Sequence, residues 1–379
     1  MELRKLIPHH AADPNVCAKV EKHLTQWASR SEDTDHRRRI FESTFMEIHQ
    51  SGLSFLSTSV STAVNYKLWP TMVEAARIAA NACASTAWIM GVVGCHRAII
   101  KRLPEPRQCQ VYGTNASQFF ASASPTQDCS MTWTSEGVWV EGRWGYSSGI
   151  EDSSWLLINA ECRYHPRSIA GQKFMVVVPT DEVKILPVWD SLGMRGTGSH
   201  DVIIQKGLVP HEQLYSIENL FSSRISKNSN DYLEQAELYP YLTSVIIGPI
   251  FGCTEAAFAH YIDSLSPQAK ALHSDSIKLL AAKLNSLGQL YHSLLTRLDA
   301  AGTQGMSWSP NELSKLRRDR SFLARSCSEF VYQIIINLTS SYFSMQHPLQ
   351  RAWRDLQTMV SHRDVSWAEA VKRQHSILD

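Results

Sequence analysis

The sequence lacks an excess of charge of either sign. Its 37 lysine and arginine residues nearly balance its 36 aspartate and glutamate residues, which leaves a formal net charge of +1. Such a chain has no field that would attract nucleic acid or an anionic membrane surface. Its most apolar run, Val245–Phe251, is too short to span a bilayer, and its N-terminal residues contain no secretory signal. We therefore expect a cytoplasmic protein that binds neither nucleic acid nor membrane.

The chain also lacks the spacing patterns of metal sites and disulfide frameworks. Its eight cysteines are scattered without a CxxC pair, and its 15 histidines form no HExxH or HxH pattern. We therefore predict no metal site, and reduced cysteines that fill core positions. The sequence contains no dinucleotide-binding motif, so any electrons for redox chemistry would have to come from outside the chain.

The sequence does contain a change of pattern, from helical to β and back to helical. Apolar residues repeat at helical spacing over 15–111, short β-rich runs separated by turn residues fill 116–220, and long amphipathic segments return after a polar stretch at 222–231. Because strands and helices do not alternate, a doubly wound α/β fold is excluded. We predict an α+β, mostly α fold. Its parts are an N-terminal helical domain at 1–114, a middle β-barrel-like domain at 115–222 and a C-terminal four-helix bundle at 223–379.

Within this outline, the periodicity predicts individual helices. It predicts a continuous helix over 85–103 and a loop over 53–65. In the C-terminal part the helices are expected at 233–265, 269–301, 310–342, 348–361 and 365–378.

The most informative stretch is PVWDSLGMRGTGSHDVIIQKGLVP, residues 187–210. It contains Gly193, Gly196 and Gly198, and three glycines so close together require positive φ angles or a close approach of another group. The residues alone predict either a plain connecting loop or a loop that closes over a cofactor. The stretch resembles the signature of the acyl-CoA dehydrogenase fold. More narrowly, it is similar to the two-component flavin-dependent monooxygenases built on that fold.

A second motif is STAWIMGVVGCH, residues 85–96. On a helix, Trp88, Val92 and Cys95 would share one face with His96 beside them. The residues alone favour a tight helix–helix contact with a hydrogen-bonded histidine. In the monooxygenases that the chain resembles, STAW is followed eight residues after the tryptophan by a histidine that faces the flavin and substrate pocket. The resemblance implies that His96 orients substrate or peroxide, that Trp88 contacts the cofactor and that Met90 lines the substrate pocket.

A third motif is GRWGYSSG, residues 142–149, which predicts a strand and a turn. It resembles the GxWx(F/Y)xSG segment that lies beside the flavin ring. The resemblance implies that the hydroxyl of Ser148 reaches flavin N5 as a neutral donor, with Ser147 beside it. The preceding strand, FFASASP, would place Ser122 and Ser124 at the ring edge, although small residues in a packed strand explain it equally well.

The last motif is HPLQRAWRDLQTMVSH, residues 347–362. It resembles the segment of the monooxygenases that carries a substrate-side histidine. The resemblance implies that His362 is the base for a phenol or heteroaromatic NH, a role that suits a side chain with an unperturbed pKa near 6.5. It also implies that Met359 lines the substrate pocket. Near this site we expect Arg351, Arg354 and Asp355 to form a buried ion-pair network.

The same segment differs from acyl-CoA dehydrogenases of the common type. When the two are aligned on WRD, the tyrosine and catalytic glutamate of those enzymes fall on His362 and Arg363. Arginine cannot act as a general base, so acyl-CoA desaturation is disfavoured. The RxxFG motif that supports the FAD pyrophosphate is missing as well, which leaves FAD and FMN both open.

The resemblance therefore implies a two-component flavin-dependent monooxygenase. An NAD(P)H:flavin reductase would supply reduced FAD or FMN, and reaction with O2 would give a C4a-hydroperoxyflavin. This species would hydroxylate or epoxidise a small aromatic substrate, such as a phenol, an indole or a polycyclic natural product. We expect a homotetramer or homodimer. Two alternatives stay open: an acyl-CoA dehydrogenase or oxidase-type flavoenzyme, and a non-catalytic scaffold member of the fold.

Overall fold

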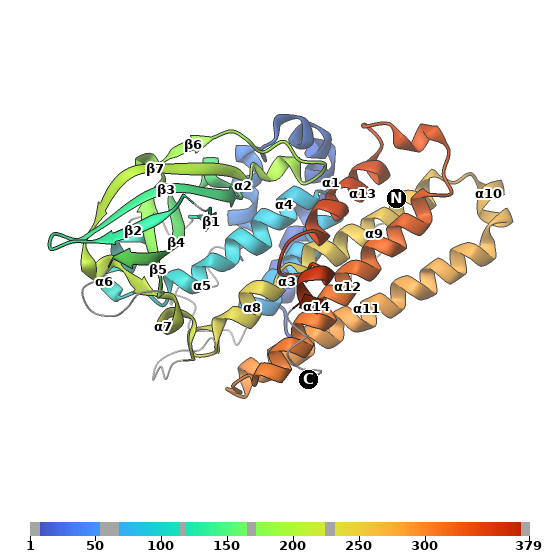
Figure 1. The fold of residues 1–379 in the computed structure, drawn as a ribbon. Helices are drawn as coiled ribbons and strands as arrows, with labels where there is room; N and C mark the ends of the chain where they lie inside the picture. The colour runs from blue at the N-terminus through green and yellow to red at the C-terminus, as the bar shows by residue number, and fades with distance from the viewer. Residues whose placement is uncertain are drawn as a thin grey trace.

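The computed structural model describes residues 8–53, 68–113, 118–126, 128–164, 172–223 and 232–372. Helices from both ends of the chain pack together beside a β-sheet that the middle of the chain forms (Figure 1). The order of helices, sheet and helices is therefore as predicted. Most of the loop predicted at 53–65 and of the polar stretch at 222–231 lies outside the described residues. The domain boundaries at 114 and 222 stay a prediction.

The N-terminal part is helical. Asp13 caps its first helix by accepting hydrogen bonds from the backbone N–H groups of Asn15 and Val16, and Pro14 occupies the first helical position. The helices are α1 (Pro14–Arg37), α2 (Glu42–Gln50), α3 (Leu68–Ala80), α4 (Ala84–Trp88), α5 (Arg97–Ile100) and α6 (Glu105–Tyr112). Every residue of α3 is buried, which makes it the central helix of this part.

The middle of the chain forms one sheet in the order β6-β7-β3-β1-β4-β5-β8, and β2 pairs with both β3 and β4. Its core includes Trp144, whose indole N–H donates to the carbonyl of Asn159. The strands are β1 (Phe120–Pro125), β2 (Ser130–Trp133), β3 (Val138–Ser147), β4 (Trp155–Tyr164), β5 (Lys173–Pro179), β6 (Lys184–Leu186), β7 (His200–Val209) and β8 (Tyr215–Ser216). The β-rich pattern of 116–220 therefore corresponds to a real sheet.

The C-terminal helices follow the short helix α7 (Ile217–Phe221). They are α8 (Leu238–Ser244), α9 (Ile247–Ser264), α10 (Pro267–Leu272), α11 (Ser274–Thr303), α12 (Pro310–Ile335), α13 (Pro348–Val360) and α14 (Trp367–Lys372). The helices predicted at 233–265 and 269–301 are each divided in two, and the helix predicted to reach 342 ends at Ile335. Apolar periodicity continues from α8 into α9 because both helices face the main core, whereas α10 has no buried residues.

The helix predicted over 85–103 is not continuous. After Trp88 the backbone forms a π-helical turn at Ile89–Val93 and a 3-10 turn at Gly94–His96 before α5 begins. Here the chain lies close against α3, since a Cβ at Gly94 would lie 2.6 Å from Met72 Cε. Val92, within the π turn, and His96, at the end of the 3-10 turn, are partly exposed, while Cys95 is buried. Such π turns are often found at functional sites.

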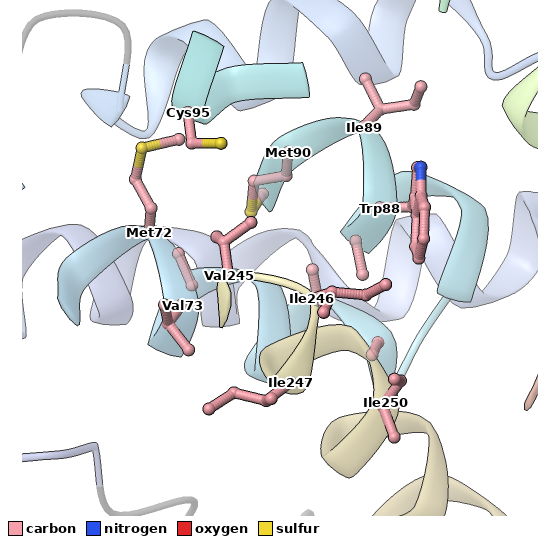
Figure 2. Close-up of a cluster of buried hydrophobic side chains, with 14 of the residues drawn as sticks. Met72, Val73, Trp88, Ile89, Met90, Cys95, Val245, Ile246, Ile247 and Ile250 are labelled. Atoms are coloured by element: carbon pink, nitrogen blue, oxygen red, sulfur yellow. The ribbon is translucent and has the colours of Figure 1, made fainter. Parts of the chain in front are cut away.

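The side chains around this turn form part of the main hydrophobic core. Figure 2 shows Trp88, Met90 and Cys95 beside side chains of α3 and of the junction between α8 and α9. The N-terminal and C-terminal helices thus share a single core, and the sheet has a second core of its own. Leu238–Ser264 is long and apolar enough to cross a membrane, but 83% of its most apolar window is buried inside the protein, as in a core helix. The apolar run Val245–Phe251, which we judged from the sequence to be too short to span a bilayer, is therefore only part of a longer apolar segment.

Residues 187–199, which we call the clamp loop, join the sheet to α13 and α1. The backbone N–H of Gly193 donates to Thr358 Oγ1 (3.0 Å), and that of Met194 donates to Asp355 Oδ1 (2.5 Å). Gly193 lies so close to α13 that a Cβ there would be 2.2 Å from the carbonyl oxygen of Arg354. This glycine therefore permits a close approach, as the sequence suggested.

Arg354 links the clamp loop to α1. Its guanidinium donates to the carbonyl of Leu192 (2.8 Å) and pairs with Asp35 of α1 (2.9 Å), and both charged residues are buried. Arg354 was expected in a network with Asp355. Its ion pair is instead with Asp35, and Asp355 accepts the backbone N–H of Met194.

We expect Asp35→Ala to lower the free energy of unfolding by about 3–5 kcal/mol, because it leaves the charge of Arg354 buried and unpaired. Denaturant unfolding of the two proteins measures this difference. Glu329→Ala is the matched control. It removes an ion pair between Arg325 and Glu329 whose side chains are 53% and 56% exposed, and it should cost less than about 1 kcal/mol. Equal losses in the two variants would contradict a central role for the buried pair.

Candidate active site

Three of the predicted site residues meet at Trp88. Its indole N–H donates to Ser148 Oγ (3.2 Å), and its ring lies edge-on to the imidazole of His362, with 5.5 Å between ring centroids. Trp88 ends α4, Ser148 follows β3 and His362 follows α13. The fold thus brings together side chains from the N-terminal helices, the sheet and the C-terminal helices.

The position of Ser148 is set by a turn at the end of β3. Gly149 adopts a left-handed conformation (φ 69°), and its N–H donates to the carbonyl of Thr197 in the clamp loop (2.8 Å). Ser148 Oγ lies 2.7 Å from Ser199 Oγ, which lies 2.7 Å from Thr197 Oγ1. We had not predicted Ser199 and Thr197 as site residues. Their place beside the glycines of the GMRGTGS stretch was the signal that could have identified them.

Ser147 points away from this group. Successive side chains of a strand face opposite sides of the sheet, and Ser147 is fully buried while Ser148 is partly exposed. No hydrogen-bond partner for Ser147 Oγ is found among the described residues. A role for Ser147 in cofactor binding stays a prediction, and its burial does not support it.

His96 occupies a separate polar position beside β1. Its Nδ1 lies 2.6 Å from the carbonyl oxygen of Phe120, which can only accept, so Nδ1 carries the ring proton. Its Nε2 is then a lone-pair acceptor for the hydroxyl of Ser122 (3.2 Å). Burial lowers the pKa of His96 to about 4, against the opposing effect of the bond to Phe120. His96 is therefore a neutral acceptor at physiological pH.

The other residue expected at the ring edge, Ser124, lies two positions further along β1 and is partly exposed. Among the contacts of the described residues, none joins Ser124 or His96 to Ser148 or His362. A flavin contact for Ser122 and Ser124 stays a prediction.

His362 is partly exposed and lies in the turn after α13. Its Nδ1 accepts the backbone N–H of Asp364 (3.3 Å) and lies 3.7 Å from the carboxylate of the same residue. Burial lowers the pKa of His362, although the charge of Asp364 opposes the shift. With Nδ1 as acceptor, the neutral ring carries its proton on Nε2. A ring with its proton on Nδ1, directed at the Asp364 carboxylate, would present Nε2 as a base.

The two methionines expected in the substrate pocket, Met90 and Met359, are both buried in the main core. Met90 belongs to the π-helical turn, and Met359 lies in the last turn of α13, three residues before His362. Their burial makes them core residues in this structure, and contact with a substrate stays a prediction.

Apart from the carboxylate of Asp364 beside His362, the polar groups of the site are neutral: an indole, hydroxyls and imidazoles. In the described part of the chain, no group of three or more histidine, cysteine, aspartate or glutamate side chains is placed to hold a metal ion. A set of neutral donors and acceptors beside buried aromatic and aliphatic side chains suits a ring system with polar edges and apolar faces, and a flavin has this character. The residues present therefore fit the cofactor that the sequence implied.

Comparison with known proteins bears on the fold of the chain. Residues 245–367 match the family model for the acyl-CoA dehydrogenase C-terminal domain. The chain is 22% identical over 362 residues to HsaA of Mycobacterium tuberculosis (strain CDC 1551 / Oshkosh), the oxygenase subunit of a flavin-dependent monooxygenase. The match covers 90% of this chain and 89% of the relative.

Two solved structures are similar over most of the chain. XiaF from Streptomyces sp., in complex with FADH2 and glycerol, gives a TM-score of 0.84 at 21% identity, covering 94% of this chain and 93% of XiaF. TdsC from Paenibacillus sp. A11-2, with FMN and indole, gives a TM-score of 0.77 at 19% identity, covering 95% and 96%.

These matches, together with the order of helices, sheet and helices, define a protein of the acyl-CoA dehydrogenase fold. Within that fold, the chain is similar in sequence to the oxygenase subunits of flavin-dependent monooxygenases. The resemblance seen in the sequence is thereby confirmed.

The low pKa of His96 predicts how stability depends on pH. In the folded protein His96 stays uncharged down to about pH 4, whereas in the unfolded chain it gains a proton below about pH 6.5. Between these values the unfolded state binds more protons, so the free energy of unfolding falls as the pH is lowered from about 6.5 to 4.

His96→Asn removes this contribution. The stability advantage of the wild type over the variant should therefore shrink on acidification, by up to about 1.4 kcal/mol per pH unit. Denaturant unfolding of both proteins at several pH values measures the difference. The comparison uses a single-site variant because the pKa values of His49 and His260 are also lowered to about 4. Parallel pH profiles of wild type and variant would show that His96 is not held neutral.

Proposed function

We propose that this protein is the oxygenase component of a two-component flavin-dependent monooxygenase. It would take reduced FAD or FMN from an NAD(P)H:flavin reductase and use O2 to insert one oxygen atom into a small aromatic substrate. The contact of Trp88 with both Ser148 and His362 carries the proposal, because it gathers the three implied site residues from distant parts of the chain. The function of HsaA and the flavins in XiaF and TdsC support it, and the indole in TdsC supports an aromatic substrate.

The bound reduced flavin would supply the two electrons that O2 activation requires. Ser148 would hold the N5 edge of the ring, and Trp88 would fix the position of Ser148 through their hydrogen bond. The apolar side chains around the π-helical turn, shown in Figure 2, would keep water away from this side of the ring. Either FAD or FMN is compatible with these contacts.

The two histidines would have different tasks. His96 is neutral and its Nε2 accepts the Ser122 hydroxyl, so it would orient a substrate OH or NH through the oxygen of Ser122, which can still accept a hydrogen bond. His362 would remove the proton of that group, with its own Nδ1 proton directed at Asp364. Hydroxylation of a phenol or an indole uses such a base, because loss of the proton raises the electron density of the ring.

The first rival is an acyl-CoA dehydrogenase or oxidase-type flavoenzyme. The position of its catalytic glutamate corresponds to Arg363, which is exposed in the turn after α13 and cannot accept a proton. Anaerobic reduction of bound flavin by an acyl-CoA would support this rival.

The second rival is a non-catalytic scaffold, and a lack of measurable affinity for reduced flavin would support that reading.

The function is tested by mixing the protein with anaerobically reduced FMN or FAD and then with O2 and a panel of phenols and indoles. We expect oxygenated product that depends on the protein, the reduced flavin and O2. His362→Ala should still bind reduced flavin and consume O2, but should form product about 10²–10⁴-fold more slowly and release hydrogen peroxide instead. Arg363→Ala is the matched control and should behave as the wild type. If His362→Ala oxygenates the substrate at the normal rate, our role for His362 is wrong.

We further propose a homodimer or homotetramer in the cytoplasm. Large apolar side chains are exposed on the C-terminal helices and the loop before α13, and a partner copy would cover them: Leu272, Leu279, Phe322, Tyr332, Ile336, Phe343 and Met345. All eight cysteines are free, which supports a reducing compartment. Light scattering during gel filtration should give two or four times the chain mass of 42.7 kDa. A mass equal to one chain would contradict the assembly.

A further inference from the structure

A chain of hydroxyl groups runs from the candidate active site into the clamp loop. Ser148 Oγ lies 2.7 Å from Ser199 Oγ, and Ser199 Oγ lies 2.7 Å from Thr197 Oγ1. Thr197 Oγ1 in turn lies 2.8 Å from the carbonyl oxygen of Met194. Thr197 and Ser199 are buried, whereas Ser148 is partly exposed at the site.

Counting the protons in this chain fixes its direction. There are three oxygen–oxygen contacts at hydrogen-bond distance, and the three hydroxyls supply one proton each. The carbonyl of Met194 can only accept, so the proton of Thr197 is used there. Ser199 must then donate to Thr197, and Ser148 must donate to Ser199.

Ser148 therefore has no proton left for a ligand. Its oxygen already accepts the indole N–H of Trp88 (3.2 Å) and has one further lone pair. The sequence led us to expect a neutral donor at flavin N5, but the hydrogen-bond chain makes Ser148 an acceptor. This distinction matters because N5 of reduced flavin carries a hydrogen, whereas N5 of oxidised flavin has only a lone pair.

We propose that Thr197 and Ser199 are positioning residues that hold the Ser148 hydroxyl as an acceptor, so that the site prefers reduced to oxidised flavin. The inference rests on the proposed function, since it places flavin N5 at Ser148. An N5–H group would complete the hydrogen bonding of Ser148. An unprotonated N5 would face a lone pair and lose that bond.

The backbone holds the hydroxyl chain in place. Gly149, next to Ser148, donates its N–H to the carbonyl of Thr197, and Gly198 takes a left-handed conformation (φ 52°) between the two positioning residues. The clamp loop is fixed in turn by its bonds to α13. The hydroxyl chain is thus formed before any ligand binds, as a selective site requires.

The test is the ratio of two dissociation constants, that of oxidised flavin divided by that of reduced flavin, measured by anaerobic titration with FMN and with FAD. We expect the wild type to bind the reduced form more tightly. Ser199→Ala and Thr197→Val each release a proton toward Ser148, so each should lower the ratio about tenfold, which corresponds to about 1.4 kcal/mol. Thr197→Ser keeps the hydroxyl and should keep the ratio.

Ser191→Ala is the matched control. Ser191 lies in the same loop and donates to the carbonyl of Gly193 (2.5 Å), but it is not part of the hydroxyl chain. The Ser191→Ala variant should therefore have the wild-type ratio of flavin dissociation constants. If Ser199→Ala and Thr197→Val bind both flavin forms with the wild-type ratio, the inference is wrong while the proposed function stands. If the wild type binds neither form, the proposed function and the inference both fail.

Discussion

The buried ion pair between Arg354 and Asp35 is the constraint on which the rest of the structure depends. It joins α13 to α1, and the same guanidinium holds the clamp loop through the carbonyl of Leu192. The clamp loop carries Thr197 and Ser199, and α13 leads to His362. One buried pair thus fixes two elements that border the site. Its cost in desolvation is offset because each charge is hydrogen-bonded in place.

The helix that carries site residues is interrupted between them. Trp88, whose indole meets Ser148 and His362, ends α4, and His96, which is bonded to the carbonyl of Phe120 in β1, lies in the 3-10 turn that follows the π-helical turn. The two histidines of the site have opposite proton arrangements at Nδ1. His96 donates there and His362 accepts. This difference is what allows one to orient a substrate and the other, after a change of tautomer, to act on it.

The sequence predicted the order of helices, sheet and helices, because apolar periodicity reports which side of an element is buried. It missed the break at Val245 and the turns within 89–96, because both sides of each break face one core, and it missed the break at His273, where α10 has no buried residues. Trp88, Ser148 and His362 were identified only through the resemblance, since nothing in their spacing shows that they meet. The place of Thr197 and Ser199 beside the glycines could have suggested them as site residues, but their role could not be predicted, because the direction of a hydroxyl chain depends on distances that appear only in the fold.

The central claim is that reduced flavin and O2 react in this protein to oxygenate an aromatic compound. It is tested most directly by turnover under ¹⁸O2, with reduced flavin supplied externally and the product analysed by mass spectrometry. The account predicts that the product gains one ¹⁸O atom and that the second atom appears in water. Product that contains oxygen only from water, or flavin that is reduced by an acyl-CoA instead, would contradict it.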